Sequence, residues 1–339
     1  MMGVQLMGRS TWLFSEPPGI IATAVTGGPK EGRGPLKADF DYVFDSARAG
    51  KETFEQAEQE IFKKSCELVI NKAAIAPGDI NYFISGDLMN QITSSSFVAR
   101  SLEIPYIGIF GACSSAILGM ALGSQMIAAG SAQKVLTGSV SHNCTAERQF
   151  RYPNEYGCQK PAYSQYTATA AGAAIIGGAG QGSVSVIAAT LGRVVDLSVS
   201  DPFNMGAAMA PAAANTVFEF FKESGQDPKQ YDLIVTGDLS RYGREICWEL
   251  LTRQGFSYEK SRFVDCGMLL YGDDKNVFAG GSGCGCVAAV SYGHLYNKLA
   301  NGKLKRILIA ATGALLSPVS SQQCESIPGI SHAVALEGN

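Results

Sequence analysis

The chain has 339 residues, of which 46% are hydrophobic and 17% charged, so it can bury a large core in one big domain or in two packed halves. Its formal net charge is −3 and no window is rich in Lys and Arg, which excludes the basic stripe typical of nucleic-acid-binding proteins. The nine cysteines are scattered and form no Cys-x-x-Cys pair, so we expect reduced thiols, no metal site and no cofactor.

Strands and helices alternate through the first half of the chain. Apolar runs predict strands at 20–28 and 78–88, and a helical pattern at 53–73 lies between them. A short buried strand at 107–110 runs into the Gly-rich turn of FGACSSA, and an apolar helix follows at 116–129. Because that helix is too short to span a bilayer, we expect no transmembrane segment, and we also expect no signal peptide.

The second half repeats this order. A strand at 185–193, a helix at 213–224 and a strand at 229–239 correspond to their counterparts in the first half, and both 78–88 and 229–239 end in Gly-Asp-Leu. The stretch 281–312 repeats the plan of a Gly-rich turn, an apolar helix, a glycine stop and a buried strand. We therefore predict two duplicated halves, which are residues 1–180 and 181–339.

The order of the elements also predicts the fold. Alternating strands and helices imply right-handed crossovers and a mostly parallel sheet in each half. The helix after each Gly-rich turn is apolar around its circumference, which is typical of a helix buried on all sides. Two such helices would pack back to back between the sheets, with amphipathic helices outside. We therefore predict an α/β fold built as a five-layer helix–sheet–helix–sheet–helix sandwich.

Cys113 stands in the turn before the first buried helix. A thiol at a helix N-terminus lies in the positive end of the helix dipole, where the thiolate is favoured. Counting back from the glycine stops at Gly130 and Gly302 places Gly285 at the equivalent position of the second half. Three interpretations of Cys113 stay open, namely a binding-pocket residue, an inherited structural residue and a working nucleophile.

Two sets of motifs carry a resemblance to known families. The duplicated plan, with GACSSA before the first buried helix and TAAGAAIIGG at 169–178, resembles the thiolase and ketoacyl-synthase superfamily. The longer stretches SHNCTAERQFRYPNEYGCQKPAYSQYTATAAGAAIIG and SPVSSQQCESIPGISHAV resemble the stage V sporulation protein AD family of spore-forming bacteria. This second likeness runs from about residue 5 to the C-terminus.

The narrower resemblance implies a function. That family is described as binding dipicolinic acid (pyridine-2,6-dicarboxylate) and as acting with membrane proteins of the same sporulation operon, which move the compound into the developing spore. It implies a location in the spore or forespore, at the inner spore membrane through those partners, and the superfamily fold implies a homodimer. Whether calcium accompanies the dicarboxylate stays open.

Cys113 lacks the partners that the broader resemblance implies. Condensing enzymes use histidines, or a histidine and an asparagine, to assist the thiolate and to stabilise an oxyanion. In the initiating ketoacyl synthases the first partner ends the strand that matches 229–239, where this chain has Gly237 and Asp238. The second comes from the turn that matches GGSGCGC, which has neither residue type. We therefore expect no catalysis and interpret Cys113 as a former nucleophile.

Several side chains are candidates for binding a planar dianion. His142 follows a buried strand, and His332 can approach the same crevice from the C-terminal segment. The segment 142–166 mixes Arg and Lys with tyrosines and is long enough to cover a site or to form a dimer contact. Cationic groups and the N–H groups of a helix N-terminus can bind carboxylates. The predicted ligand-binding residues are Cys113, Ser114, Ser115, His142, Arg148, Lys160, Asp238 and His332.

Two alternative functions stay open. The chain could be a cysteine-dependent condensing enzyme or thioesterase that acts on acyl-CoA or acyl-carrier substrates through Cys113. It could also be a structural platform with an empty pocket, which would bind partners without small-molecule affinity. The rate of thiol alkylation tests the enzyme alternative, because an activated thiolate reacts quickly at neutral pH.

Overall fold

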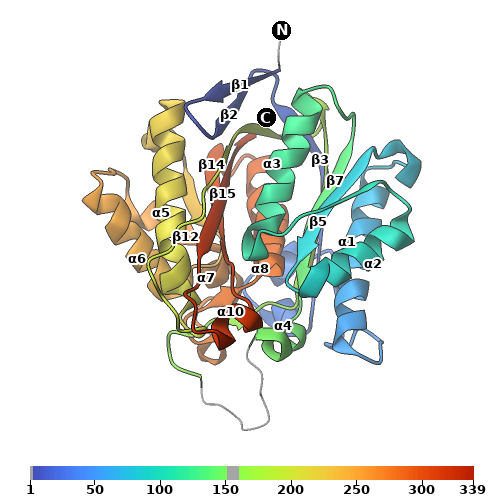
Figure 1. The fold of residues 1–339 in the computed structure, drawn as a ribbon. Helices are drawn as coiled ribbons and strands as arrows, with labels where there is room; N and C mark the ends of the chain where they lie inside the picture. Colours follow the sequence, from blue (N-terminus) through green and yellow to red (C-terminus); the bar gives the residue numbers. More distant parts are fainter. Residues whose placement is uncertain (1–2, 151–159) are drawn as a thin grey trace.

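The computed structural model describes residues 3–150 and 160–339 and has five layers (Figure 1). From right to left in that view, outer helices cover one sheet, two helices fill the middle, and further outer helices cover a second sheet. The predicted five-layer sandwich is confirmed. The layer helices are α1 Phe54–Lys72, α2 Thr93–Leu102, α3 Ser115–Ala128, α5 Met205–Ser224, α6 Ser240–Arg253 and α8 Cys284–Ala289.

The strands form two mixed sheets that share an edge. The first has the order β3-β9-β7-β5-β6, the second has the order β12-β11-β14-β15-β10, and β10 pairs with β3. The strands of the first sheet are β3 Pro18–Gly27, β5 Tyr82–Asp87, β6 Tyr106–Gly108, β7 Val135–Ser141 and β9 Ala170–Ala179. Those of the second are β10 Val184–Leu191, β11 Leu233–Thr236, β12 Phe263–Asp265, β14 Arg306–Ala314 and β15 Gly329–Gly338.

The prediction of mostly parallel sheets is only half right. Strands β5, β6 and β7 are parallel, as are β11, β12 and β14, whereas β9 pairs antiparallel with β3 and β7, and β15 pairs antiparallel with β10 and β14. An apolar run has the same pattern in a parallel or an antiparallel strand, so the direction of β9 and β15 could not be predicted from the sequence.

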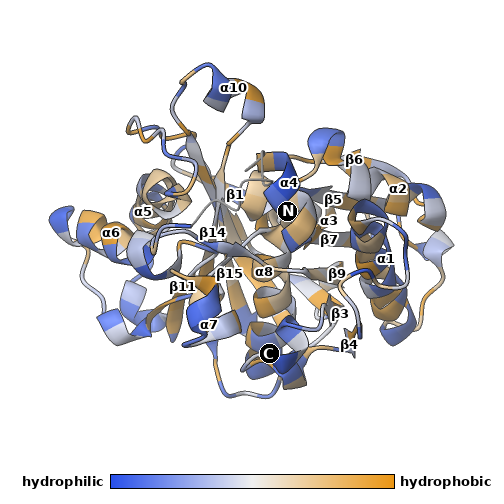
Figure 2. Ribbon diagram, turned by 90° about the horizontal axis from the view of Figure 1, so that it is seen from below, coloured by the Kyte–Doolittle hydropathy of each residue, from blue (hydrophilic) through white to orange (hydrophobic). Residues whose placement is uncertain are grey.

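The central helices fit between the sheets because small residues face the strands. A Cβ added to Gly119 of α3 would lie 2.2 Å from Thr137 Oγ1, and one added to Gly285 of α8 would lie 2.0 Å from the Ala170 carbonyl oxygen. The end-on view in Figure 2 shows hydrophobic colouring concentrated on the sheets and on α8. Apolar side chains of α3, α8 and both sheets therefore form the central part of the core.

Local signals explain some helix boundaries and miss others. The Thr53 side chain caps α1 by accepting a hydrogen bond from the Gln56 N–H (3.2 Å), and Gly225 ends α5 at a φ of 67°. Helix α5 starts at Met205, earlier than the predicted 213. The segment 142–166, predicted to cover a site or to form a dimer contact, begins with a helix.

The remaining helices and strands are α4 Asn143–Phe150, α7 Cys266–Tyr271, a π-helix Val290–Leu295, α9 Tyr296–Ala300, α10 Pro318–Gln322, β1 Val4–Met7, β2 Thr11–Phe14, β4 Tyr42–Val43, β8 Tyr166–Thr167 and β13 Gly281–Ser282.

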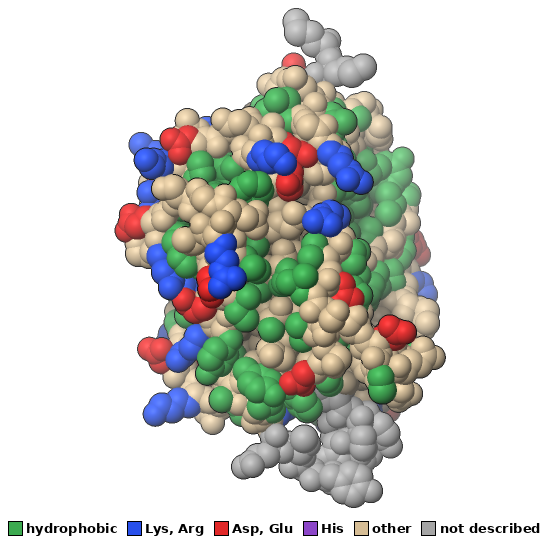
Figure 3. All heavy atoms as spheres, turned by 60° about the vertical axis from the view of Figure 1, so that its left-hand side comes forward, with side chains coloured by type: hydrophobic (Ala, Val, Ile, Leu, Met, Phe, Trp, Pro, Cys, Tyr) green, Lys and Arg blue, Asp and Glu red, His purple; other side chains and the backbone are tan. Residues whose placement is uncertain are grey.

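The surface carries charges of both signs. Figure 3 shows the side of the molecule around α5 and α6, where Lys and Arg side chains alternate with Asp and Glu.

No helix in the described part of the chain is both long and apolar enough to cross a bilayer. The same residues contain no group of three or more His, Cys, Asp or Glu that could hold a metal ion. The division into halves at residue 180 stays a prediction.

Candidate functional site

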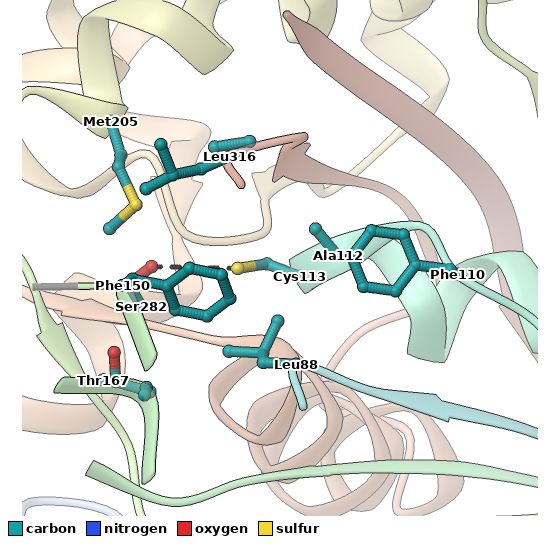
Figure 4. A pocket seen from close by; sticks show the side chains of 11 residues that line it. Leu88, Phe110, Ala112, Cys113, Phe150, Thr167, Met205, Ser282 and Leu316 are labelled. Atoms are coloured by element: carbon teal, nitrogen blue, oxygen red, sulfur yellow. Dashed lines mark hydrogen bonds between the residues drawn. The ribbon is translucent and has the colours of Figure 1, made fainter. Parts of the chain in front are cut away.

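A small cavity lies beside Cys113 at the lower end of the molecule in Figure 1, next to α4 and α10 (Figure 4). The parallel strands β5, β7, β11 and β14 end in this region, and open α/β sheets bind ligands at the carboxyl ends of their strands. The cavity has a volume of about 30 Å³, enough for a water molecule or one small chemical group. We call it the inner cavity. Its lining residues are Leu88, Phe110, Ala112, Cys113, Ala146, Phe150, Thr167, Met205, Ser282, Ala314 and Leu316.

A wider groove continues from the inner cavity toward the surface. It has a volume of about 380 Å³, within the range of small-molecule sites, and we call it the outer groove. Its floor includes Leu88, Phe110, Phe150 and Leu316, which also line the inner cavity. The rest of its lining comes from residues 89–92, Gly108, Ile109, Gln149, Leu315, Ser317 and Pro318. A ligand could therefore extend from the groove to Cys113.

The Cys113 thiol is buried and protonated. It lies in the 3₁₀ turn Ala112–Ser114 ahead of α3, and its Sγ is 4.0 Å from Ser282 Oγ. Burial raises the pKa of the Cys113 thiol well above its usual value, and the negative charge of Asp238 raises it further. The expectation of a favoured thiolate is therefore wrong, because burial and a nearby carboxylate outweigh the helix dipole.

Asp238 connects three segments behind the inner cavity. Its carboxylate accepts hydrogen bonds from Ser282 Oγ (2.9 Å), the Gly283 N–H (3.1 Å) and Thr312 Oγ1 (3.0 Å). Burial raises the pKa of Asp238, and these hydrogen bonds oppose that shift. Parallel pairing of β13 with β8 sets Ser282 opposite Thr167, which is how both reach the cavity wall. Asp238 thus orients one wall of the cavity.

A second buried acidic group lies on the first-half side. Asp87 accepts hydrogen bonds from the Met89 N–H (2.8 Å) and the Ser95 N–H (2.7 Å), so it caps the turn that follows its strand. Burial raises its pKa to about 6. Burial and the charge of Asp87 also raise the pKa of Glu58, a fully buried residue of α1 whose carboxylate accepts a hydrogen bond from Thr145 Oγ1. Acidic groups therefore surround the cavity on both sides.

Residues 8–337 match the family described as stage V sporulation protein AD (SpoVAD). The chain is 42% identical over 334 residues to stage V sporulation protein AD of Bacillus subtilis (strain 168), and the alignment covers 98% of each protein. The chain belongs to the stage V sporulation protein AD family. It is therefore a sporulation protein, as the longer sequence motifs implied.

Solved structures with the same fold are enzymes of the thiolase superfamily. The 3-oxoacyl-[acyl-carrier-protein] synthase III of Aquifex aeolicus VF5 superposes with a TM-score of 0.60 at 14% identity, covering 94% of this chain and 99% of that one. Human mitochondrial 3-ketoacyl-CoA thiolase in complex with CoA gives 0.59 at 13% identity, covering 96% and 98%. At such low identity the likeness establishes the thiolase-like fold of this SpoVAD family member and nothing about its chemistry.

The predicted residues Ser114, Ser115 and His142 already form hydrogen bonds within the protein. Ser114 Oγ donates to the Gly111 carbonyl (2.6 Å), and Ser115 Oγ donates to the Ala112 carbonyl (2.7 Å). His142 is buried, with Nε2 2.8 Å from the Ala47 carbonyl and Nδ1 accepting from the Cys144 N–H (3.1 Å). These contacts assign a neutral ring to His142, and burial lowers its pKa.

The predicted cationic residues pair with carboxylates. Arg148 of α4 forms an ion pair with Glu55, and Lys160 Nζ lies 2.6 Å from Glu147 Oε1. His332 of β15 is 5% exposed, neither ring nitrogen has a hydrogen-bond partner among the described residues, and burial lowers its pKa to about 4. None of these three side chains lines the inner cavity or the outer groove.

Of the predicted ligand-binding residues, Cys113 lines the inner cavity and Asp238 lies directly behind it. Most of the lining was not predicted, because it consists of single apolar residues such as Phe150, Met205 and Leu316 from segments far apart in the sequence. For Phe110 and Ser282, one feature of the sequence could have indicated a place in the lining, because each lies next to a Gly-rich turn. Of the aromatic residues predicted in 142–166, Tyr152 and Tyr156 lie outside the described residues.

Proposed function

We propose that this SpoVAD family member is a non-catalytic protein that binds dipicolinic acid and takes part in its uptake into the developing spore. The ligand would lie in the outer groove with one end in the inner cavity. One observation carries the proposal. Cys113 occupies the position of a nucleophile, yet burial and Asp238 hold its thiol protonated beside a cavity that is open to small molecules.

The chemistry of the lining supports binding rather than reaction. A condensing enzyme needs a thiolate and a histidine or asparagine near it. None of the described residues that line the inner cavity is a histidine or an asparagine. Phe110 and Phe150 offer aromatic faces for a flat ring instead.

We further propose that the protein works as a homodimer at the inner spore membrane, held there by membrane proteins of the same sporulation operon. The proposal holds for the free acid and for its calcium salt, since both present the same planar ring. These proposals rest on family membership and on the resemblance of the sequence.

The test is a calorimetric titration of the full chain with dipicolinate, with pyridine-2-carboxylate as the comparison ligand. We expect binding of the dicarboxylate only. Cys113→Ala should weaken binding by about tenfold because it removes a side chain from the cavity wall. Cys247→Ala truncates an equally buried thiol of α6 away from the site and should leave the affinity unchanged. No heat at millimolar dipicolinate would overturn the proposal.

Lys160→Ala tests the predicted contact between the ligand and a cationic side chain. Because Lys160 pairs with Glu147, its loss could act through the ion pair instead, and Glu147→Gln removes that pair while keeping the cation. A loss of affinity in Lys160→Ala alone supports direct contact with the ligand. An equal loss in both variants shows that the ion pair matters and not the contact.

A further inference from the structure

The site is unusual for a dicarboxylate because those of its lining residues that the structure describes carry no positive charge. Among the described residues, none of the side chains that line the inner cavity or the outer groove is Lys, Arg or His. The predicted cations Arg148 and Lys160 pair with Glu55 and Glu147. A free carboxylate entering the inner cavity would therefore lose its hydration without gaining a cation, which is costly.

The Ser282 hydroxyl, which lines the inner cavity together with that of Thr167, has the wrong polarity for an anion. The Ser282 hydroxyl donates its hydrogen to Asp238 Oδ2 at 2.9 Å, so its lone pairs are what remain for the cavity. The Asp238 carboxylate behind it, which also interacts with the Gly283 N–H, Thr312 Oγ1 and the Cys113 thiol, would repel a second carboxylate. This wall favours a group that brings a hydrogen-bond donor.

The described titratable groups around Cys113 and Asp238 do not neutralise the negative charge of a ligand carboxylate. Each is acidic or a thiol, so none supplies a positive charge near neutral pH. Those that act on Cys113 or on Asp238 are Cys284, Cys286, Cys266 and Asp265, with Glu58 and Asp87 beyond Cys284.

The two volumes limit how a dicarboxylate can lie. About 30 Å³ in the inner cavity admits one small group, whereas about 380 Å³ in the outer groove admits an aromatic ring. The second carboxylate would then lie in the groove, where Gln149 Nε2 already donates to Asn90 Oδ1 and water has access. Only one carboxyl group would face Cys113 and Asp238.

We infer that the inner cavity accepts a carboxyl group only together with a proton taken up from solvent on binding, so that the ligand carboxyl donates this proton to Ser282 Oγ, which donates its own hydrogen to Asp238. Two carboxyl groups on either side of one hydroxyl group hold one proton between them because the ionisation of both at short range is costly. No covalent bond forms or breaks, and Asp238 acts as a specificity determinant. This inference rests on the proposed function.

Calorimetry of the full chain with dipicolinate, in two buffers of different protonation enthalpy, measures the proton directly. We expect about one proton taken up per ligand at pH 7 and at pH 8. Linkage then requires the association constant to fall about tenfold for each pH unit through this range. Both measurements use the wild-type protein and need no variant to fold.

Two variants locate the proton. Asp238→Asn removes the charge and should abolish the uptake, with an affinity at pH 8 on the order of tenfold above wild type. Asp227→Asn is a matched control, since Asp227 is an exposed carboxylate that also accepts a backbone hydrogen bond (Lys229 N–H, 2.9 Å) but lines neither the inner cavity nor the outer groove. It should behave as wild type.

The possible outcomes separate the inference from the proposed function. Binding without proton uptake, at an affinity independent of pH, would overturn the inference and leave dipicolinate binding intact. Binding that requires added calcium, disappears with a chelator and takes up no proton would also overturn it, since a cation would then neutralise the carboxylate. The absence of binding at every pH would overturn the proposed function.

Discussion

The Cys113 thiol is subject to opposing effects of different size. A helix N-terminus stabilises a nearby anion by about 0.3–1 kcal/mol, whereas burying an unpaired charge costs several kcal/mol. Here the thiol is buried and Asp238 lies close to it, so the thiol form prevails. The sequence predicts the position of Cys113 because a turn and a helix are local features. Its ionisation depends on Asp238, which is 125 residues away in the chain (238 − 113).

Alkylation rates test the state of Cys113. We expect iodoacetamide to modify Cys113 at pH 7 on the order of tenfold or more slowly than the exposed Cys324, because reaction needs an accessible thiolate. Mass spectrometry of the two peptides over time gives both rates, and urea should make the rates similar. A Cys113 rate above that of Cys324 in the native protein would favour the enzyme alternative.

His332 is a second residue whose environment the sequence could not predict. Its folded-state pKa of about 4 lies below the ordinary 6.5, so the unfolded chain binds an extra proton between these values. Its contribution to stability is therefore complete above pH 6.5 and is lost as the pH falls toward 4. Leu is similar in size and does not titrate.

We expect His332→Leu to be more stable than wild type at pH 5 by on the order of 1–3 kcal/mol. The difference should shrink at pH 8, where His332 is neutral in both states. Urea denaturation at several pH values measures the free energy of unfolding. If the free energy of unfolding depended on pH in the same way in both proteins, His332 would not change its protonation when the protein unfolds.

At the scale of elements, the layers were predictable and the connections were not. The apolar circumference of α3 and the repeated Gly-rich turn predicted two central helices, and both lie there. The direction of β9 and β15 was missed because an apolar run has the same pattern in a parallel or an antiparallel strand. Helix α4 was missed because it is short and its eight residues, NCTAERQF, are mostly polar.

At the element scale, close packing leaves no room for a side chain at Gly285, the residue that the sequence predicts as the counterpart of Cys113. A Cβ added to Gly285 of α8 would lie 2.0 Å from the Ala170 carbonyl oxygen and 2.7 Å from Ser141 Oγ. We expect Gly285→Ala to lower the free energy of unfolding by about 1–3 kcal/mol, because α8 must move away from β9.

Urea denaturation followed by circular dichroism measures this loss. Gly178→Ala in β9 is the matched control, since its Cβ would meet no atom within 4 Å. It should change stability by less than about 0.5 kcal/mol. An unchanged midpoint in Gly285→Ala would mean that the two central helices are not held tightly against the sheet.

At the scale of the whole molecule, several buried carboxyl groups make folding take up protons. Burial raises the pKa of Asp87 to about 6 and of Asp265 to about 7, and it also raises those of Glu58 and Asp238. A raised folded pKa means that the native state binds more protons than the unfolded chain. Stability should therefore fall as the pH rises from about 5 to 8, in spite of the opposite contribution of His332.

Glu58→Gln isolates one of these groups. The amide resembles the protonated carboxyl, and its carbonyl can still accept the hydrogen bond from Thr145 Oγ1. At pH 5 the variant and the wild type should have similar stability. As the pH rises the variant should become the more stable, by up to about 1.4 kcal/mol for each unit in which Glu58 stays protonated only in the native state.

Glu223→Gln makes the same chemical change, but we expect it to change the stability at pH 8 in the opposite direction. Burial acts to raise the pKa of Glu223, but hydrogen bonds from Thr11 Oγ1 and from the N–H groups of Arg9 and Ser10 outweigh it and lower the pKa. Glu223 therefore stabilises the native state above its unfolded pKa, and its variant should lose stability at pH 8. If both variants shifted the urea midpoint in the same direction at pH 8, protonation of the buried carboxyl groups could not be the cause, because the fold raises the pKa of Glu58 and lowers that of Glu223.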